Sequence, residues 1–140
     1  LIKYMMILTL LVVSIILYMV MDYLWIGILM KGFYTKSLSG IGRIENGSFK
    51  PRIFSMILVY VSLGFLTVFY LIPRITGFNK ESLIFAFLFG FALYVFYEYT
   101  NHAIIKDWPR KIILLDCVWG GVLVALGSCL TFIISAKIFF

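Results

Sequence analysis

Long uninterrupted apolar runs, rather than alternating or amphipathic patterns, dominate this chain. Charge-free stretches cover residues 4–21, 53–73 and 82–97, and from residue 112 onward only two charged residues interrupt the apolar sequence. A transmembrane helix needs about 20 such residues, whereas a transmembrane barrel would show alternating segments of about 10. We therefore predict four transmembrane helices, near residues 4–30, 53–74, 82–105 and 111–136.

The connections between these helices are short, which predicts an all-α, antiparallel four-helix bundle that forms a single domain over residues 1–140. The only extended loop is expected at residues 36–50, where the turn pair Asn46-Gly47 occurs. Pro73 is expected to bend or end the second helix, because proline lacks the amide hydrogen that continues a helix.

The composition excludes a soluble domain and a disulfide-stabilised scaffold. Hydrophobic residues make up 64% of the chain and charged residues only 13%, whereas a soluble domain has about 25% charged residues. A soluble domain of this size could not hide so much apolar surface from water. Two cysteines are too few for a disulfide scaffold. The chain is therefore predicted to be an integral membrane protein.

Basic residues predict how the helices are oriented in the membrane. The first and third loops lie on the same side and hold eight of the twelve Lys and Arg residues: Lys31, Lys36, Arg43, Lys50, Arg52, Lys106, Arg110 and Lys111. The positive-inside rule then places these loops in the cytoplasm and both termini on the other side. Contact with anionic head groups accounts for the net charge of +6. We expect membrane lipids as partners, with a homo-oligomer or a larger membrane complex, and no nucleic acid.

Three acidic residues, Asp22, Glu98 and Asp116, lie inside the predicted helices. With a helix rise of 1.5 Å per residue, they lie about 12, 10 and 8 Å from the loop side of the membrane. An acid at the centre of a membrane helix costs at least ~2.5–3.5 kcal/mol, so three at one depth indicate a functional site. Three anions so close together cannot all stay ionised, and we expect at least one to hold a proton.

Polar and aromatic residues accompany these acids at helical spacing. Trp25 follows Asp22 by three residues and Trp119 follows Asp116 by three, within two segments that share the pattern Asp-x-(Leu/Val)-Trp-x-Gly. This similarity indicates either a short internal duplication or a coincidence. Residues three or four positions apart share a helix face, so Tyr94, Asn101 and His102 lie on the same face as Glu98. The candidate site for a ligand or proton consists of Asp22, Trp25, Tyr94, Glu98, Asn101, His102, Asp116 and Trp119.

A metal site is a narrower hypothesis for the same residues. Glu98 and His102 are four residues apart and could chelate one ion together with Asp22 and Asp116. A lone histidine near a membrane end is more often a hydrogen-bonding or interfacial residue, so no metal is predicted. Motifs for nucleophilic catalysis, phosphate binding and dinucleotide binding do not occur, and no cofactor is expected.

Three functions fit this pattern. The first is a proton-linked site that binds or moves an ion or a small or lipid-like molecule, and we favour it. The second is an intramembrane enzyme that acts on lipid-like substrates, with the carboxylates as general acid and base. The third is a structural or assembly subunit of a membrane complex, in which the acids hold the helices together.

Several of these residues belong to longer motifs. The segments Tyr97 to Asn101, Trp108-Pro109, Asp116 to Gly120, Asp22 to Trp25 and Phe33-Tyr34 resemble a family of small four-helix membrane proteins catalogued as domain of unknown function 2177. The resemblance implies a four-helix fold and a polar motif set, without an established activity: Asp22, Trp25, Glu98, Thr100, Asn101, Trp108, Asp116, Trp119 and Gly120.

Two residues depart from the pattern of this family. Glu98 stands where the family usually has aspartate, which keeps the charge on a longer side chain. His102 stands where an apolar residue is usual, which argues further against a metal site.

Overall fold

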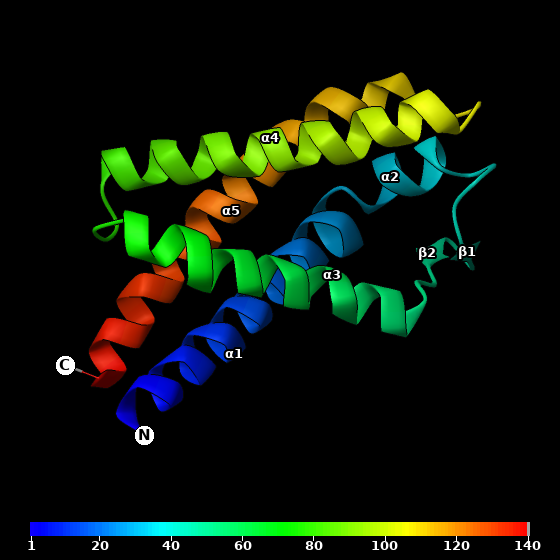
Figure 1. The fold of residues 1–140 in the computed structure, drawn as a ribbon. Coiled ribbons are helices and arrows are strands. Elements are labelled where there is room, and N and C mark those ends of the chain that lie inside the picture. The colour runs from blue at the N-terminus through cyan, green and yellow to red at the C-terminus, as the bar shows by residue number, and fades with distance from the viewer. Residues whose placement is uncertain (140) are drawn as a thin grey trace.

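The computed structural model describes residues 1–139, and helices form nearly all of it (Figure 1). Four helical stretches are long and apolar enough to cross a membrane: Ile2–Leu29, Ile53–Arg74, Lys80–Ile104 and Arg110–Phe139. Each lies within a few residues of a span predicted from the apolar runs, so the all-α prediction is confirmed. The chain is an integral membrane protein that crosses the bilayer several times.

The first two spans are not uniform α-helices. The first span ends in a short segment of wider, π-helical turns, and the second contains such a segment near its end. Pro73 follows the latter segment in a 3₁₀ turn that ends the span, as predicted. π-Helical turns are rare and often accompany functional sites. The helical elements of the four spans are α1 (Ile2–Asp22), η1 (Tyr23–Leu29), α3 (Ile53–Leu66), η2 (Thr67–Leu71), η3 (Ile72–Arg74), α4 (Lys80–Ile104) and α5 (Arg110–Phe139).

The long first loop is folded. The short helix α2 (Lys31–Ser37) follows η1, and the strands β1 (Ile44–Glu45) and β2 (Ser48–Phe49) then pair in antiparallel fashion. Asn46 and Gly47 connect the strands with φ angles of 50° and 71°. Two successive positive φ angles are typical of the tight hairpin turn that the pair Asn-Gly favours.

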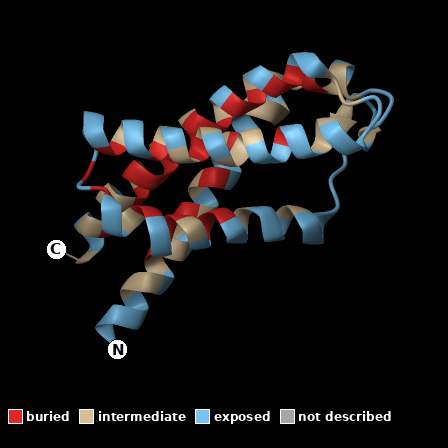
Figure 2. Ribbon diagram, turned by 45° about the horizontal axis from the view of Figure 1, so that its top comes forward, coloured by how far each residue is buried: buried red, intermediate tan, exposed pale blue. Residues whose placement is uncertain are grey.

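Successive spans run in opposite directions, and both termini lie at the same end of the molecule (Figure 1). The opposite end carries α2, the hairpin and the connection from α4 to α5, and we call it the loop end. Helix α5 contacts both α4 and α1, and α3 packs against α1. Buried positions concentrate on α5 and on the helix faces that meet it, while the outer faces are exposed (Figure 2). An apolar outer surface is what lipid contact requires.

Small residues bring α4 and α5 into close contact. A Cβ atom on Gly90 would overlap the carbonyl oxygen of Gly120 and would lie 2.6 Å from Cβ of Val124. Helices in membranes associate through such small residues, because packing replaces the hydrophobic effect there. This contact fixes the positions of α4 and α5 relative to each other, and these helices carry Glu98 and Asp116.

One cluster of buried core residues lies on the terminal side of these acids. It consists of Tyr18, Leu63, Leu71, Leu123 and Val124. The Tyr18 hydroxyl pairs with Oγ1 of Thr67 at 2.6 Å, in the π-helical segment of the second span. Tyr18 therefore satisfies its polar group within the core, although it is only one helical turn from Asp22.

Candidate functional site

Asp22 connects three of the four spans. It is the last residue of α1 and its side chain is buried. Its Oδ1 atom accepts a hydrogen bond from Nε1 of Trp119 on α5 at 2.8 Å, and its Oδ2 atom accepts one from the Tyr60 hydroxyl on α3 at 3.1 Å. Both carboxylate oxygens thus have a partner, each from a different neighbouring helix.

Asp116 is buried on α5, one turn before Trp119. Its Oδ1 atom accepts a hydrogen bond of 2.6 Å from the hydroxyl of Tyr34, a buried residue of α2. The Tyr34 hydroxyl in turn accepts a bond of 3.3 Å from Nε1 of Trp25. Helix α2 therefore folds back over the loop end of the spans and supplies the partner of Asp116.

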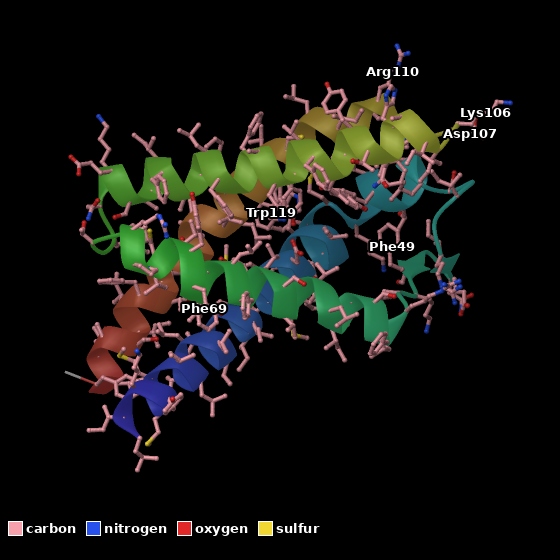
Figure 3. All side chains as sticks on the ribbon, in the orientation of Figure 1. Phe49, Phe69, Lys106, Asp107, Arg110 and Trp119 are labelled. Carbon is pink, nitrogen blue, oxygen red and sulfur yellow. The ribbon has the colours of Figure 1, made fainter. Side chains whose placement is uncertain are left out.

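Trp25 and Trp119 join the surroundings of the two aspartates. Their rings stack with centroids 4.5 Å apart and planes 9° from parallel. Trp119 binds Asp22, and Trp25 reaches Asp116 through Tyr34. In each of the two similar segments, the tryptophan therefore contacts the aspartate of the other segment, directly or through Tyr34. Figure 3 shows Trp119 inside the helix bundle.

Glu98 is completely buried on α4. Its Oε2 atom accepts a hydrogen bond of 2.8 Å from Nε1 of Trp108, in the connection between α4 and α5. Its Oε1 atom is buried without a protein partner. The carboxyl group of Glu98 neighbours that of Asp116. Two carboxyl groups can form a hydrogen bond only if one of them holds a proton.

The hydrogen bonds that the structure assigns to the three acids within residues 1–139 all come from neutral donors. Every tryptophan of the chain takes part: Trp108 and Trp119 bind acids directly, and Trp25 binds through Tyr34. Burial, together with the charge of the nearby Asp116, raises the pKa of Tyr34 far above its ordinary value. Tyr34 therefore keeps its proton and acts as a donor at every physiological pH.

The remaining predicted residues lie around this network. The half-buried Tyr94 packs against the core, and its ring occupies the space that a Cβ atom on Gly120 would need. Asn101 lies one turn after Tyr97, which is half exposed. His102 lies edge-to-face with Tyr99, at 6.3 Å between ring centroids, and lines a groove between α4 and α5. The aspartates and their tryptophans are thus brought together, whereas His102 faces a different surface.

The metal hypothesis can be compared with this geometry. Within the described part of the chain, no group of three or more His, Cys, Asp or Glu side chains is placed to hold a metal ion. Glu98, His102 and Asp116 do not form such a group. The hydrogen-bond partners of the acids are instead indole and phenol groups.

A family model described as "predicted membrane protein", for domain of unknown function 2177, matches residues 7–133. The chain belongs to this family. No match was found among the curated proteins or the solved structures. The match includes most or all of each span and every residue of the network described above, and it confirms the resemblance seen in the sequence motifs.

Six of the nine family motif residues take part in the network, whereas Thr100, Asn101 and Gly120 do not. Thr100 is exposed, and its hydroxyl donates to the backbone oxygen of Phe96 on its own helix at 2.6 Å. Gly120 serves the site indirectly, because its missing side chain admits the ring of Tyr94. The motif therefore combines residues that bind the acids with residues that allow the helices to approach.

Three donors of the network are absent from the candidate set that spacing predicted. Tyr34 and Trp108 lie near span ends, where aromatic residues normally suit the membrane interface, yet both donate to buried acids. The family motifs contain both residues, and these motifs were the feature of the sequence that could have identified them as part of the site. Tyr60 lies in an apolar span with no local signal, and only the packing of α3 against α1 reveals it.

Proposed function

We propose that Glu98 and Asp116 share one exchangeable proton. We further propose that this proton is linked to the binding or movement of an ion or a small or lipid-like molecule. The observation that carries the proposal is the fully buried carboxyl group of Glu98, which has one unpartnered oxygen and neighbours the carboxyl group of Asp116. A proton shared between two neighbouring carboxyl groups would give a buried, unpartnered carboxyl oxygen a partner.

The surroundings of the pair support a proton rather than a fixed ion pair. A Lys or Arg partner would hold the acids as permanent anions, but the donors are the neutral groups of Tyr34 and Trp108. Neutral donors stabilise an anion less than a cation does, so both protonation states of the pair are accessible.

A chain of contacts links the charge of the Glu98–Asp116 pair to the other residues of the site. Tyr34 contacts Asp116, Trp25 contacts Tyr34, and Trp25 stacks on Trp119, which binds Asp22. Loss of the proton would strengthen the bond from Tyr34 to Asp116 and thereby shift α2 and the stacked tryptophans. Ligand binding near these residues would be linked to protonation in the same way.

The shared proton can be tested with the variant Glu98→Gln. We expect the parent protein at neutral pH to show the infrared carbonyl band of a protonated carboxylic acid, and we expect this band to disappear at alkaline pH. In Glu98→Gln the band should be absent at neutral pH, because the amide introduced by the substitution donates to Asp116 and leaves that group ionised. The measurement is infrared spectroscopy of the purified protein in lipid nanodiscs.

Glu81→Gln is the matched control, because Glu81 is exposed in the first turn of the same helix. This variant should keep the band of the parent. A parent protein without the band at neutral pH, or a band that persists unchanged in Glu98→Gln, would contradict the shared proton.

The proposal also places the loop end in the cytoplasm, because the loops there hold eight of the twelve basic residues. Cysteines introduced at the exposed positions Lys36 and Lys106 should react with an impermeant maleimide only in inside-out vesicles. A cysteine at Lys80, exposed at the opposite end, should react only in right-side-out vesicles. The parent for these variants replaces the buried Cys117 and Cys129 with alanine. The reverse labelling pattern would invert the orientation.

The hydrogen bonds of Asp22 support a second candidate function, that of a structural or assembly subunit. Both of its carboxylate oxygens are occupied by donors from α3 and α5, so this residue ties three spans together. Polar bonds between membrane helices can serve packing alone. The unpartnered oxygen of Glu98 distinguishes the proposed proton site from Asp22.

A further inference from the structure

We propose that a groove on the outer surface between α4 and α5 binds one anionic phospholipid, with an acyl chain in the groove and the phosphate at Arg110. The lipid belongs to the leaflet at the loop end of the molecule. This inference concerns a different surface from the carboxyl network, and it does not depend on the proposed proton site.

The groove has a volume of about 530 Å³. Its walls are mainly apolar and come from Phe91 and Val95 on α4 and from Ile113 and Leu114 on α5. Its polar lining residues include His102 and Arg110. An acyl chain is the ligand that an apolar groove open to the bilayer accepts.

The length and position of the groove match one leaflet. Phe91 and His102 are separated by 11 residues of α4, or about 16 Å at the rise of an α-helix. The hydrocarbon core is about 30 Å thick, so this distance equals about half of it. His102 lies two residues from the end of α4 at Ile104, which places the polar part of the groove at the head-group level.

The charge at this level favours an anion. Arg110 begins α5, at the positive end of the helix dipole, and the first turn of α5 contains no acidic residue. Lys106 and Arg110 extend from the loop end of the molecule, together with one acid, Asp107 (Figure 3). Lys111 lies on another side of α5, where its Nζ atom is 5.9 Å from the ring centre of Phe33. The groove therefore ends at a site of excess positive charge.

These features select a phospholipid over a partner helix. A helix from a second chain would present a continuous apolar side along the whole span, whereas this groove covers one leaflet and ends at a cation. Basic pockets between membrane helices are known sites for anionic head groups. The predicted selectivity is for charge at the head group, since the acyl chain is common to all phospholipids.

The experiment is native mass spectrometry of the purified protein titrated with phosphatidylglycerol or with phosphatidylcholine of identical chains. The parent should bind phosphatidylglycerol more tightly. Arg110→Gln should weaken phosphatidylglycerol binding about fivefold, the factor that corresponds to the contribution of one basic residue at a membrane surface. Its affinity for phosphatidylcholine should not change.

Two further variants separate the groove from general charge effects. Leu114→Trp fills the groove from an exposed position, and it should lower phosphatidylglycerol binding although the charge is unchanged. Lys137→Gln removes a charge at the opposite end of α5 and should have no effect. Equal losses in Arg110→Gln and Lys137→Gln, or undiminished binding in Leu114→Trp, would overturn the proposal. So would a dimer of the parent that only Leu114→Trp dissociates, since a second copy would then occupy the groove.

Discussion

Replacing Gly90 with alanine should destabilise the protein by about 1–3 kcal/mol, the usual cost of adding an atom to a fully packed site. The new methyl group would overlap the carbonyl oxygen of Gly120, which is backbone and cannot rotate away as a flexible side chain can. Helices α4 and α5 would have to separate along their contact. Glu98 and Asp116 lie on these two helices, so their carboxyl groups should also move apart.

The stability is measured by unfolding in mixed micelles with increasing sodium dodecyl sulfate, followed by far-ultraviolet circular dichroism. Gly32→Ala is the control, because a Cβ atom at Gly32 in α2 has no neighbour within 4 Å. That variant should be neutral or slightly stabilising, since alanine favours a helix over glycine. Equal stability of Gly90→Ala and the parent would mean that α4 and α5 are not in contact at this position.

Replacing Asp22 with leucine should destabilise the protein by up to about 6 kcal/mol. The substitution removes the acceptor of the partly buried Trp119 and Tyr60 side chains at once, and a donor left without a partner costs about 1–3 kcal/mol where it is fully buried. The loss should appear in the same unfolding assay. Tryptophan emission should change as well, because the indole of Trp119 loses its partner next to the ring of Trp25.

A double-mutant cycle with Tyr60→Phe separates the hydrogen bond from other effects of the substitution. In the parent, Tyr60→Phe should be destabilising, because the bond to a carboxylate is lost. In the Asp22→Leu background the same change removes an unpartnered hydroxyl and should be neutral or stabilising. If Tyr60→Phe lowers the free energy of unfolding by the same amount in both backgrounds, Asp22 and Tyr60 do not interact.

The outcome for Asp22 also bears on function. If Asp22→Leu only lowers stability, and the infrared band attributed to Glu98 and Asp116 persists, Asp22 is a structural residue beside an independent proton site. If the band also changes, the stacked tryptophans link Asp22 to the pair as the geometry suggests.

The apolar runs of the sequence were enough to predict the four spans. Asp22, Glu98 and Asp116 could be placed at one level because helix rise converts residue number into depth, and the structure connects Asp22 and Asp116 through Trp119, Trp25 and Tyr34. Hydropathy and helix rise are local properties that do not depend on how the helices pack. For this reason the spans predicted from apolar runs agree closely with those of the structure.

The hydrogen-bond partners of the acids could not be predicted from the sequence, because they depend on how the helices pack. Spacing along one helix predicted that Trp25 accompanies Asp22 and that Trp119 accompanies Asp116, but the two tryptophans exchange partners across a stacked pair. Tyr60 and Tyr34 reach the acids from 38 and 82 residues away in the sequence. Such contacts depend on how each helix is rotated about its axis and on α2 folding back over the spans. That rotation is set by close contacts such as Gly90 against Gly120, which no single helix contains.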